Sequence, residues 1–273
     1  MLDLRQRLSI AGIDPASLQT LREVAVEGDE ALEKLPETPI ERLRPICVLP
    51  CEPEKLNNVW QQLYNVREMT HRYPVILGTR KDLGHHWEMQ EDRLLPGDYV
   101  RRAEKISVST WTDRVINELL DEKLIVQHIE DDETQHQPQN RKNASLFDVR
   151  NYVGSGWTKN TIFYIGLIKS PAPWQIAAQL AFGCWNDCPC PEIHVAFHHY
   201  WYSQYAMEPI IFEFDSLVCR VGNPPNTLED ALRLAREIVA YCPDYINLAS
   251  RPVTLKDVAA ELLNNTVWAF WWD

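Results

Sequence analysis

The hydrophobic positions along the chain are spaced in ways that predict alternating strands and amphipathic helices. The last apolar run, residues 267–272 followed by Asp273, is the most aromatic segment of the sequence. A run of β-branched and aromatic residues is typical of a buried strand. We therefore expect the C-terminus to insert into the fold and to carry the Asp273 carboxylate and the chain-end carboxylate to a defined position.

The clearest pattern lies in residues 160–273. The runs that predict strands are 161–168, 174–182, 209–214 and 216–221, and the last two resemble a hairpin. An aromatic helix is predicted over residues 192–205. Two more helices are predicted to begin at Thr227 and Thr254, because an acidic residue follows each threonine by three positions, which is typical of a helix cap.

The N-terminal half is predicted in two parts. Residues 1–45 indicate an outer helical layer or lid, with helix starts at Asp14-Pro15 and Thr38-Pro39. Residues 46–129 indicate an α/β half, with a helix over residues 53–71 and another beginning at Thr110. The helix over 53–71 joins two short strands, residues 46–49 and 74–78, a connection that favours a parallel pair. The intervening residues 79–105 have the composition of a loop.

Residues 130–159 are predicted to form a polar loop or linker, because 130–145 is the most polar stretch of the chain. This loop separates the α/β N-terminal half from the C-terminal α/β domain, residues 160–273. The fold class that follows is α/β or α+β, with a mixed sheet flanked by helices and the C-terminal strand inserted in that sheet.

Charge and composition limit the kinds of partner and the cellular location that we expect. The chain has 273 residues and a net charge of −12, which argues against nucleic acid as a partner because phosphate binding needs clustered lysine and arginine. No signal peptide and no membrane-spanning apolar run is visible, so a cytoplasmic protein is expected. The seven cysteines show no repeating spacing and are expected to be reduced thiols.

A group of sulfur and imidazole side chains between residues 184 and 198 is a possible metal site. Its members are Cys184, Cys188, Cys190, His194 and His198. Zinc and copper prefer such ligands, but the spacing matches no standard zinc module. Packed thiols with surface histidines are therefore the preferred interpretation, and no metal or other cofactor is assigned.

A nucleophilic cysteine is a second possibility. Cys188 and Cys242 each precede a proline, and His194 or His198 could supply a base. The neighbouring aspartates would oppose thiolate formation, and each Cys-Pro pair also fits a turn that ends an element.

Paired acids for general acid–base catalysis are a third possibility. The candidates are Glu213, Asp215, Asp244 and Asp273, but the sequence does not reveal the distances between them.

A polar and aromatic cleft is the preferred binding site. Its candidate residues stand near the predicted ends of elements, where binding residues concentrate. They are Trp185, Asn186, Cys188, Tyr241, Asp244, Trp271, Trp272 and Asp273. The competing interpretation is structural: Asn186 bridges a turn, Asp244 caps one, and the tryptophans are core.

Three motifs resemble one protein family. They are Gly183-Cys-Trp-Asn-Asp-Cys-Pro189, Tyr241-Cys-Pro-Asp244 and the closing segment from Val267 to Asp273. In this order and spacing they resemble domain of unknown function 4253 over residues 160–273, with a weaker similarity at residues 60–63 and 73–78. The resemblance implies a shared fold, and the family has no established activity to transfer.

The sequence departs from the family pattern at two cysteines. The position of Cys184 is more often glycine, and that of Cys190 is usually another small residue or proline. Chemistry at either cysteine would therefore be particular to this protein.

The leading functional hypothesis is a cytoplasmic, non-enzymatic binding or regulatory protein, including an immunity-type protein. It would hold a protein partner on an acidic, tryptophan-rich surface around Trp271, Trp272 and Asp273. The alternative is a hydrolase or a metal-dependent enzyme with its site near Cys188, His194, Asp244 and Asp273. A third interpretation is purely structural, with the terminal aromatic residues as part of the core.

Overall fold

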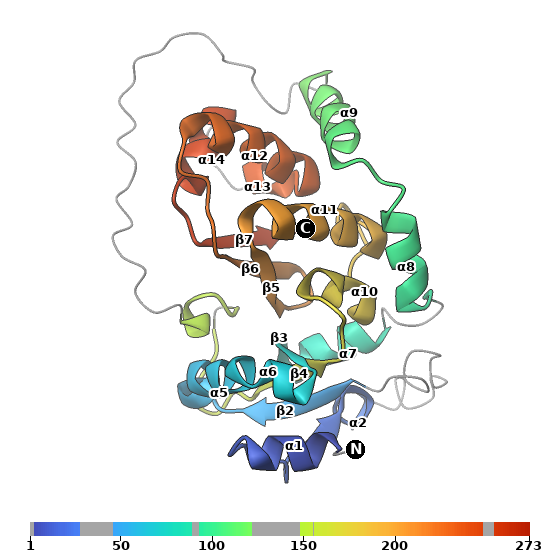
Figure 1. The fold of residues 1–273 in the computed structure, drawn as a ribbon, viewed down its shortest axis with the longest axis vertical. Helices are drawn as coiled ribbons and strands as arrows, with labels where there is room; N and C mark the ends of the chain where they lie inside the picture. Colours follow the sequence, from blue (N-terminus) through green and yellow to red (C-terminus); the bar gives the residue numbers. More distant parts are fainter. Residues whose placement is uncertain (1–2, 28–45, 89–92, 122–147, 155, 248–253) are drawn as a thin grey trace.

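A mixed β-sheet forms the centre of the molecule. The computed structural model describes residues 3–27, 46–88, 93–121, 148–154, 156–247 and 254–273 (Figure 1). Within these residues the sheet has seven strands in the order β1-β2-β4-β3-β5-β6-β7. Their bounds are β1 (Gln19–Thr20), β2 (Cys47–Cys51), β3 (Tyr73–Thr79), β4 (Phe163–Ile168), β5 (Met207–Phe212), β6 (Ser216–Val221) and β7 (Val267–Trp271).

Several strands have their carboxyl ends on the same side of the sheet. β3 and β5 are parallel, whereas the other neighbouring pairs are antiparallel. It follows that β2, β3, β5 and β7 all run in one direction. In open α/β sheets ligands bind beyond the carboxyl ends of strands, so this side is where a site is expected.

Helices cover both faces of the sheet, as the sequence predicts. α1 and α5 belong to one side, and α7, α10, α11, α12 and α14 to the other (Figure 1). The helices are α1 (Leu4–Ile10), α2 (Leu21–Val26), α5 (Pro53–Asn65), α6 (Arg67–Thr70), α7 (Arg80–Glu88), α8 (Pro96–Ala103), α9 (Val108–Asp121), α10 (Ile176–Leu180), α11 (Pro191–Tyr205), α12 (Leu228–Tyr241), α13 (Asp244–Asn247) and α14 (Leu255–Leu262). The described part of the chain also contains two 3₁₀ turns, η1 (Val149–Asn151) and η2 (Pro173–Gln175). None of the helices in the described ranges is long and apolar enough to cross a bilayer.

The predicted C-terminal strand is confirmed, and it forms the outer edge of the sheet as β7. Trp268 and Phe270 are 1% and 2% exposed, whereas Ala269 between them faces solvent. The Trp201 ring of α11 stacks on Phe270 with centroids 5.9 Å apart. Fully burying one large apolar side chain contributes about 1.5–3 kcal/mol, so this strand is anchored by its aromatic face.

Several local predictions are confirmed by the caps and pairings that form. Thr227 and Thr254 are the N-caps of α12 and α14, and each hydroxyl accepts a hydrogen bond from the backbone N–H of the acid three residues later. β5 and β6 are antiparallel neighbours in the sheet. The aromatic helix is α11, and its Phe197, Trp201 and Tyr205 are buried.

The strand predicted at residues 174–182 is wrong. Pro173 opens η2, α10 follows, and Ala181 ends that helix in the left-handed region at φ 52°. Every residue of α10 is buried. A short helix buried all round has no amphipathic period, so its pattern matches that of a buried strand.

The predicted parallel pairing of residues 46–49 with 74–78 is also wrong. The two strands run in the same direction, but β4 lies between them and is antiparallel to both. The partner strand comes from about ninety residues further along the chain, and local spacing carries no information on such a partner.

Other N-terminal predictions change as well. The segment 79–105, predicted as loop, contains α7 and α8. No helix begins at Asp14-Pro15; Asp14 instead accepts a hydrogen bond from the backbone N–H of Ala16, and α2 begins after Thr20. Thr38-Pro39 and most of the polar segment 130–159 lie outside the described residues.

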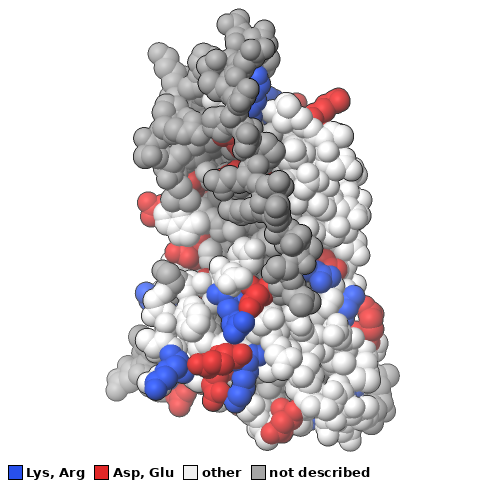
Figure 2. Space-filling model, turned by 90° about the vertical axis from the view of Figure 1, so that its left-hand side faces the viewer, with Lys and Arg blue, Asp and Glu red and all other residues white. Residues whose placement is uncertain are grey.

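Charged residues are mixed on the face that Figure 2 shows. Blue and red side chains lie next to one another over its lower part and do not gather by sign. One ordered charged group links α5 to the sheet: the guanidinium groups of Arg67 and Arg220 lie 4.0 and 4.1 Å from the Tyr64 ring centroid. Arg220 also pairs with Glu208 at 3.0 Å.

Candidate functional site

A tight loop, residues 183–190, precedes α11 and positions several of the candidate residues. The backbone N–H of Cys184 donates to the carbonyl oxygens of Cys188 and Pro189 at 3.2 and 3.0 Å. Gly183 has φ +100°, and a Cβ there would meet the Pro189 oxygen at 1.9 Å and His194 Nε2 at 2.7 Å. Only glycine fits this close approach of the loop to α11.

The loop, the start of α13 and the β5–β6 turn converge on the end of β7. Asn186 Nδ2 donates to the carbonyl oxygen of Asp273 at 2.9 Å, and the backbone N–H of Asp273 donates to Asp244 Oδ2 at 3.1 Å. The backbone N–H of Trp272 donates to the carbonyl oxygen of Asp215 at 3.0 Å. The structure thus brings together residues that are far apart in the sequence.

Two tryptophans frame these polar groups. Trp271 Nε1 donates to Asp215 Oδ2 at 3.1 Å, and the Trp185 ring stacks on Phe214 with centroids 5.1 Å apart. Both tryptophans are half-buried, so part of each ring remains accessible. We define the C-terminal surface as the exposed or half-buried group Trp185, Asn186, Asp187, Asp215, Trp271 and Asp273.

The C-terminal surface is acidic. Asp187, Asp215 and Asp273 contribute three carboxylates from three separate segments. Among the residues that the structure describes, no lysine or arginine forms an ion pair with any of the three. Their charge is therefore not neutralised by a described cation.

A polar chain lies in the core directly beneath this surface. Cys188 Sγ is 3.6 Å from His194 Nε2, and the other ring nitrogen of His194 contacts the Tyr241 hydroxyl. The same hydroxyl lies 3.0 Å from His198 Nε2. All four side chains are 3% exposed or less. We call Cys188, His194, His198 and Tyr241 the buried network.

Burial keeps the buried network uncharged. It raises the pKa of the Cys188 thiol far above its usual range and lowers the pKa of His194 well below its usual value. It also lowers the pKa of His198 to about 3. A thiolate–imidazolium pair, which activates nucleophilic cysteines, is therefore not favoured here.

The group required by the hydrolase alternative is only partly assembled. Cys188 and His194 do meet, but Asp244 and Asp273 join to each other through the Asp273 backbone N–H. The thiol is 3% exposed, so a substrate has no direct access to it.

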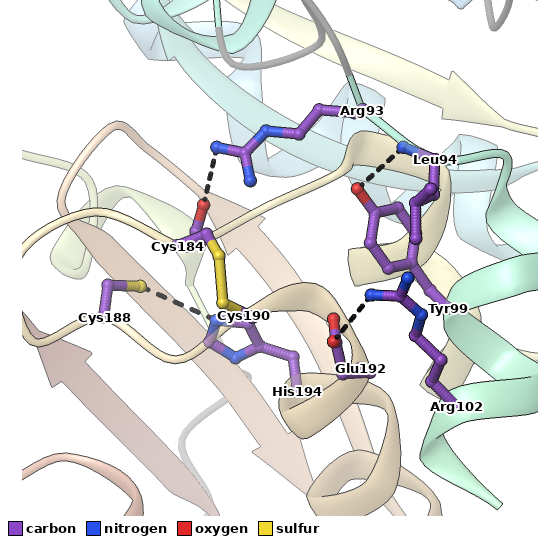
Figure 3. The surroundings of a disulfide bond; sticks show 10 residues. Arg93, Leu94, Tyr99, Arg102, Cys184, Cys188, Cys190, Glu192 and His194 are labelled. Atoms are coloured by element: carbon purple, nitrogen blue, oxygen red, sulfur yellow. Dashed lines mark hydrogen bonds and ion pairs between the residues drawn. A yellow bond between two sulfur atoms is a disulfide. The ribbon is translucent and has the colours of Figure 1, made fainter.

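Cys184 and Cys190 form a disulfide, which corrects the expectation of seven reduced thiols (Figure 3). The free cysteines are Cys47, Cys51, Cys188, Cys219 and Cys242. The bond removes two of the five possible metal ligands, and the described residues contain no group of three or more His, Cys, Asp or Glu side chains arranged to hold a metal ion.

His194 and His198 are core residues and not surface histidines, because the first half of α11, residues 191–198, is buried except at Glu192. Both are 0% exposed. Tyr241 and Trp272, predicted in the cleft, are also in the core at 0% and 1% exposure. They support the C-terminal surface from below and do not form part of it.

Two contributors were missed in the sequence and one acid lies apart from the surface. Phe214 and Asp187 were not proposed, although each is adjacent to a proposed residue. Glu213 points to a different partner: both carboxylate oxygens lie 3.1 Å from the Gly154 backbone nitrogen, and burial raises the pKa of this carboxyl.

The fold and this site define a mixed α/β protein whose last strand supports a polar and aromatic surface. Residues 164–273 match the family model described as domain of unknown function DUF4253, which confirms the resemblance read from the sequence motifs. Comparisons with curated proteins and with solved structures find no match. The matched segment begins in β4 and contains the whole C-terminal surface and the whole buried network.

Proposed function

We propose that this protein binds a cationic segment of a protein partner on the C-terminal surface. The observation that carries the proposal is the placement of three carboxylates, those of Asp187, Asp215 and Asp273, around the accessible parts of Trp185 and Trp271. Lysine and arginine side chains are the complementary groups, because they pair with carboxylates and also lie over tryptophan faces.

The surrounding contacts suit recognition. The loop, the hairpin turn and the end of β7 are joined by hydrogen bonds of 2.9–3.1 Å, so little ordering is required when a partner binds. The chain's net charge of −12 would also speed the encounter with a basic partner. Such binding suits a regulatory protein, including an immunity-type protein that blocks a basic target.

The binding surface is smaller than a tryptophan-rich sequence implies. Of the ten tryptophans, Trp268 and Trp272 are anchored in the core close to this surface. Only Trp185 and Trp271 offer ring area to a partner there. Binding energy would therefore concentrate in these two rings and the aspartates beside them.

A charge series of peptides tests the proposal. Peptides of equal length that are basic, neutral or acidic would be titrated into the protein by calorimetry. We expect the basic peptide alone to bind, with affinity that falls as salt is raised. Affinity that is independent of peptide charge would contradict the proposal.

A matched pair of variants assigns the binding to this surface. Asp187→Asn combined with Asp215→Asn removes two charges from it, and Glu118→Gln combined with Glu229→Gln removes two exposed charges from α9 and α12. The first pair should weaken binding by about tenfold or more, as for direct charge contacts, and the second by much less. Equal effects of the two pairs would place binding elsewhere.

A further inference from the structure

The disulfide has two chemically unequal ends. Cys184 is exposed to solvent, whereas Cys190 is half-buried and is the N-cap residue of the 15-residue helix α11. The Cys190 side chain makes no capping hydrogen bond while it is in the disulfide. Figure 3 shows the bond between the loop and the first turn of this helix.

We propose that Cys184–Cys190 is a thiol–disulfide exchange site that accepts two electrons from a dithiol partner. The proposal is independent of the binding function proposed above. An incoming thiolate can reach Cys184 Sγ because that residue is exposed. Cys190 is the better leaving group, because backbone N–H groups and the helix dipole stabilise an anion at a helix N-terminus.

Two arginines lie close to the disulfide. Arg93 donates a hydrogen bond to the carbonyl oxygen of Gly183, the residue before Cys184, at 3.3 Å (Figure 3). Arg102 lies 3.4 Å from Glu192, the acid in the first turn of α11, and so offsets a negative charge two residues from Cys190. Arg93 and Arg102 thus offset part of the negative charge that Asp187 and Glu192 place near the disulfide, and positive charge close to a cysteine favours its thiolate.

The exchange balances as follows. A thiolate of the partner attacks Cys184 Sγ, a mixed disulfide forms, and the Cys184–Cys190 bond breaks with its electron pair on Cys190 Sγ. The second thiol of the partner loses its proton and attacks the partner's first sulfur, which is bonded to Cys184 Sγ in the mixed disulfide. This attack forms the partner's disulfide and releases Cys184 as a thiolate. The two cysteine thiolates take up the two protons that the partner's thiols lose. The protein gains two thiols and the partner leaves as a disulfide.

The third cysteine of the loop remains outside this exchange. Cys188 lies between the two bonded cysteines in the sequence, but it is 3% exposed and directed at His194 Nε2. Burial raises its pKa, so it is held as a neutral thiol that does not attack the disulfide. Rearrangement to a different pair is therefore disfavoured.

Backbone hydrogen bonds from Cys184 to Cys188 and Pro189 hold the loop in addition to the disulfide. Cys184 has a φ of 69°, which is unfavourable for a residue with a Cβ, whereas Asn186 at 42° is of a type that often adopts this region. Opening the disulfide therefore removes one constraint on the loop, while its backbone hydrogen bonds remain. In addition, disulfides of cytoplasmic proteins are generally transient, catalytic or redox-sensing, which agrees with the location expected from the sequence.

The test uses the full chain, purified without reductant, in glutathione and dithiothreitol buffers. Alkylation of the folded protein followed by peptide mass spectrometry locates each free thiol. We expect Cys184 and Cys190 to be linked at the start and both to become alkylated after reduction. If they are not linked after purification and reoxidation, or if they stay linked in dithiothreitol while the protein is folded, the proposal is overturned.

A trapping variant identifies the attacked sulfur. Cys190→Ser leaves Cys184 as a free thiol, and Cys184→Ser leaves Cys190 as a free thiol. Cys47→Ser, which removes a free cysteine in β2 and keeps the disulfide, is the control variant. With oxidised glutathione, Cys190→Ser should form a mixed disulfide at Cys184. Reduced Cys184→Ser should react at Cys190 about tenfold faster than Cys47 does, as one unit of lowered pKa would allow. Equal rates, or capture at Cys188, would overturn the assignment. Native protein in partly reducing glutathione gives the same information without a substitution, because its transient mixed disulfide should lie on Cys184.

Discussion

The backbone N–H of Asp273 donates a hydrogen bond to Asp244 Oδ2 at 3.1 Å, across 29 positions of the chain. On the other side, Asn186 Nδ2 donates a hydrogen bond to the main-chain oxygen of the same residue at 2.9 Å, across 87 positions. The last residue is therefore held from both sides by residues of the candidate cleft. This arrangement fixes the positions of the Asp273 side chain and the neighbouring Trp271 ring on the surface.

Removing the Asp244 carboxylate should loosen this end of the molecule. Asp244 is 7% exposed, so Asp244→Ala leaves a backbone donor without its acceptor, and we expect a loss of about 1–3 kcal/mol in the free energy of unfolding. Asp244→Asn retains an oxygen acceptor and should lose less. Urea unfolding measures both. An exposed control, Asp187→Ala, should change stability by no more than about 0.5 kcal/mol; an equally small effect of Asp244→Ala would contradict this role.

The two terminal tryptophans should differ sharply when truncated. Trp272 is 1% exposed and contacts Phe182 and Tyr241, so Trp272→Ala should cost about 3–5 kcal/mol of unfolding free energy. Trp271 is half-buried and should cost far less. Thermal and urea unfolding of the two variants compare them directly. Similar losses would mean that the strand does not present opposite faces to core and solvent.

Acid should destabilise the protein through its buried histidines. Burial holds the pKa of His198 at about 3 in the folded state, against a usual value of 6.5, so unfolding takes up a proton below pH 6.5. The free energy of unfolding is therefore unaffected by His198 titration above pH 6.5, and it decreases as pH falls from 6.5 towards 3. The loss approaches about 1.4 kcal/mol per pH unit for each such histidine.

The variant His198→Gln isolates this contribution. Glutamine does not titrate, so the difference in unfolding free energy between wild type and variant should be constant above pH 6.5 and should move against the wild type as pH falls. Urea titrations at pH 7.5, 6, 5 and 4 measure it. A difference that stays constant over this range would show that His198 titrates alike in the folded and unfolded states.

Cys184 should be a better position for glycine than for alanine once the disulfide is absent. Its φ of 69° lies in the left-handed region, where a Cβ costs roughly 1–2 kcal/mol. Both substitutions remove the disulfide, so Cys184→Gly and Cys184→Ala differ only in the Cβ and in the freedom of the unfolded chain. We expect Cys184→Gly to be the more stable in urea unfolding. The reverse order would show that the loop has left this conformation.

Local features of the sequence predicted much of the C-terminal half. Thr227 and Thr254 cap helices because each cap is made within four residues, and the alternation of Trp268 and Phe270 with Ala269 defines the face of β7. The sheet order was not predictable in this way. β4 pairs with β2 and β3 through contacts between distant parts of the chain, and hydrophobic spacing identifies a strand but not its neighbour.

The candidate site shows the same division. The sequence placed Asn186, Asp244 and Asp273 together because each lies at the end of an element, and their hydrogen bonds join them in the structure. The sequence did not reveal which of the candidate side chains are buried. Tyr241 and His194 carry polar groups, as Asn186 does, yet both are fully buried, because burial depends on which helices cover a residue.

A comparative capture experiment tests whether the C-terminal surface holds a cationic protein segment. Wild-type protein and the Asp187→Asn, Asp215→Asn double variant would be immobilised and exposed to the same native lysate of the source cells, and retained proteins would be quantified by mass spectrometry. The wild-type protein should retain a basic partner in stoichiometric amount, and the double variant should lose it. Retention of the same proteins in equal amounts by both, or of no protein by the wild type, would contradict this expectation.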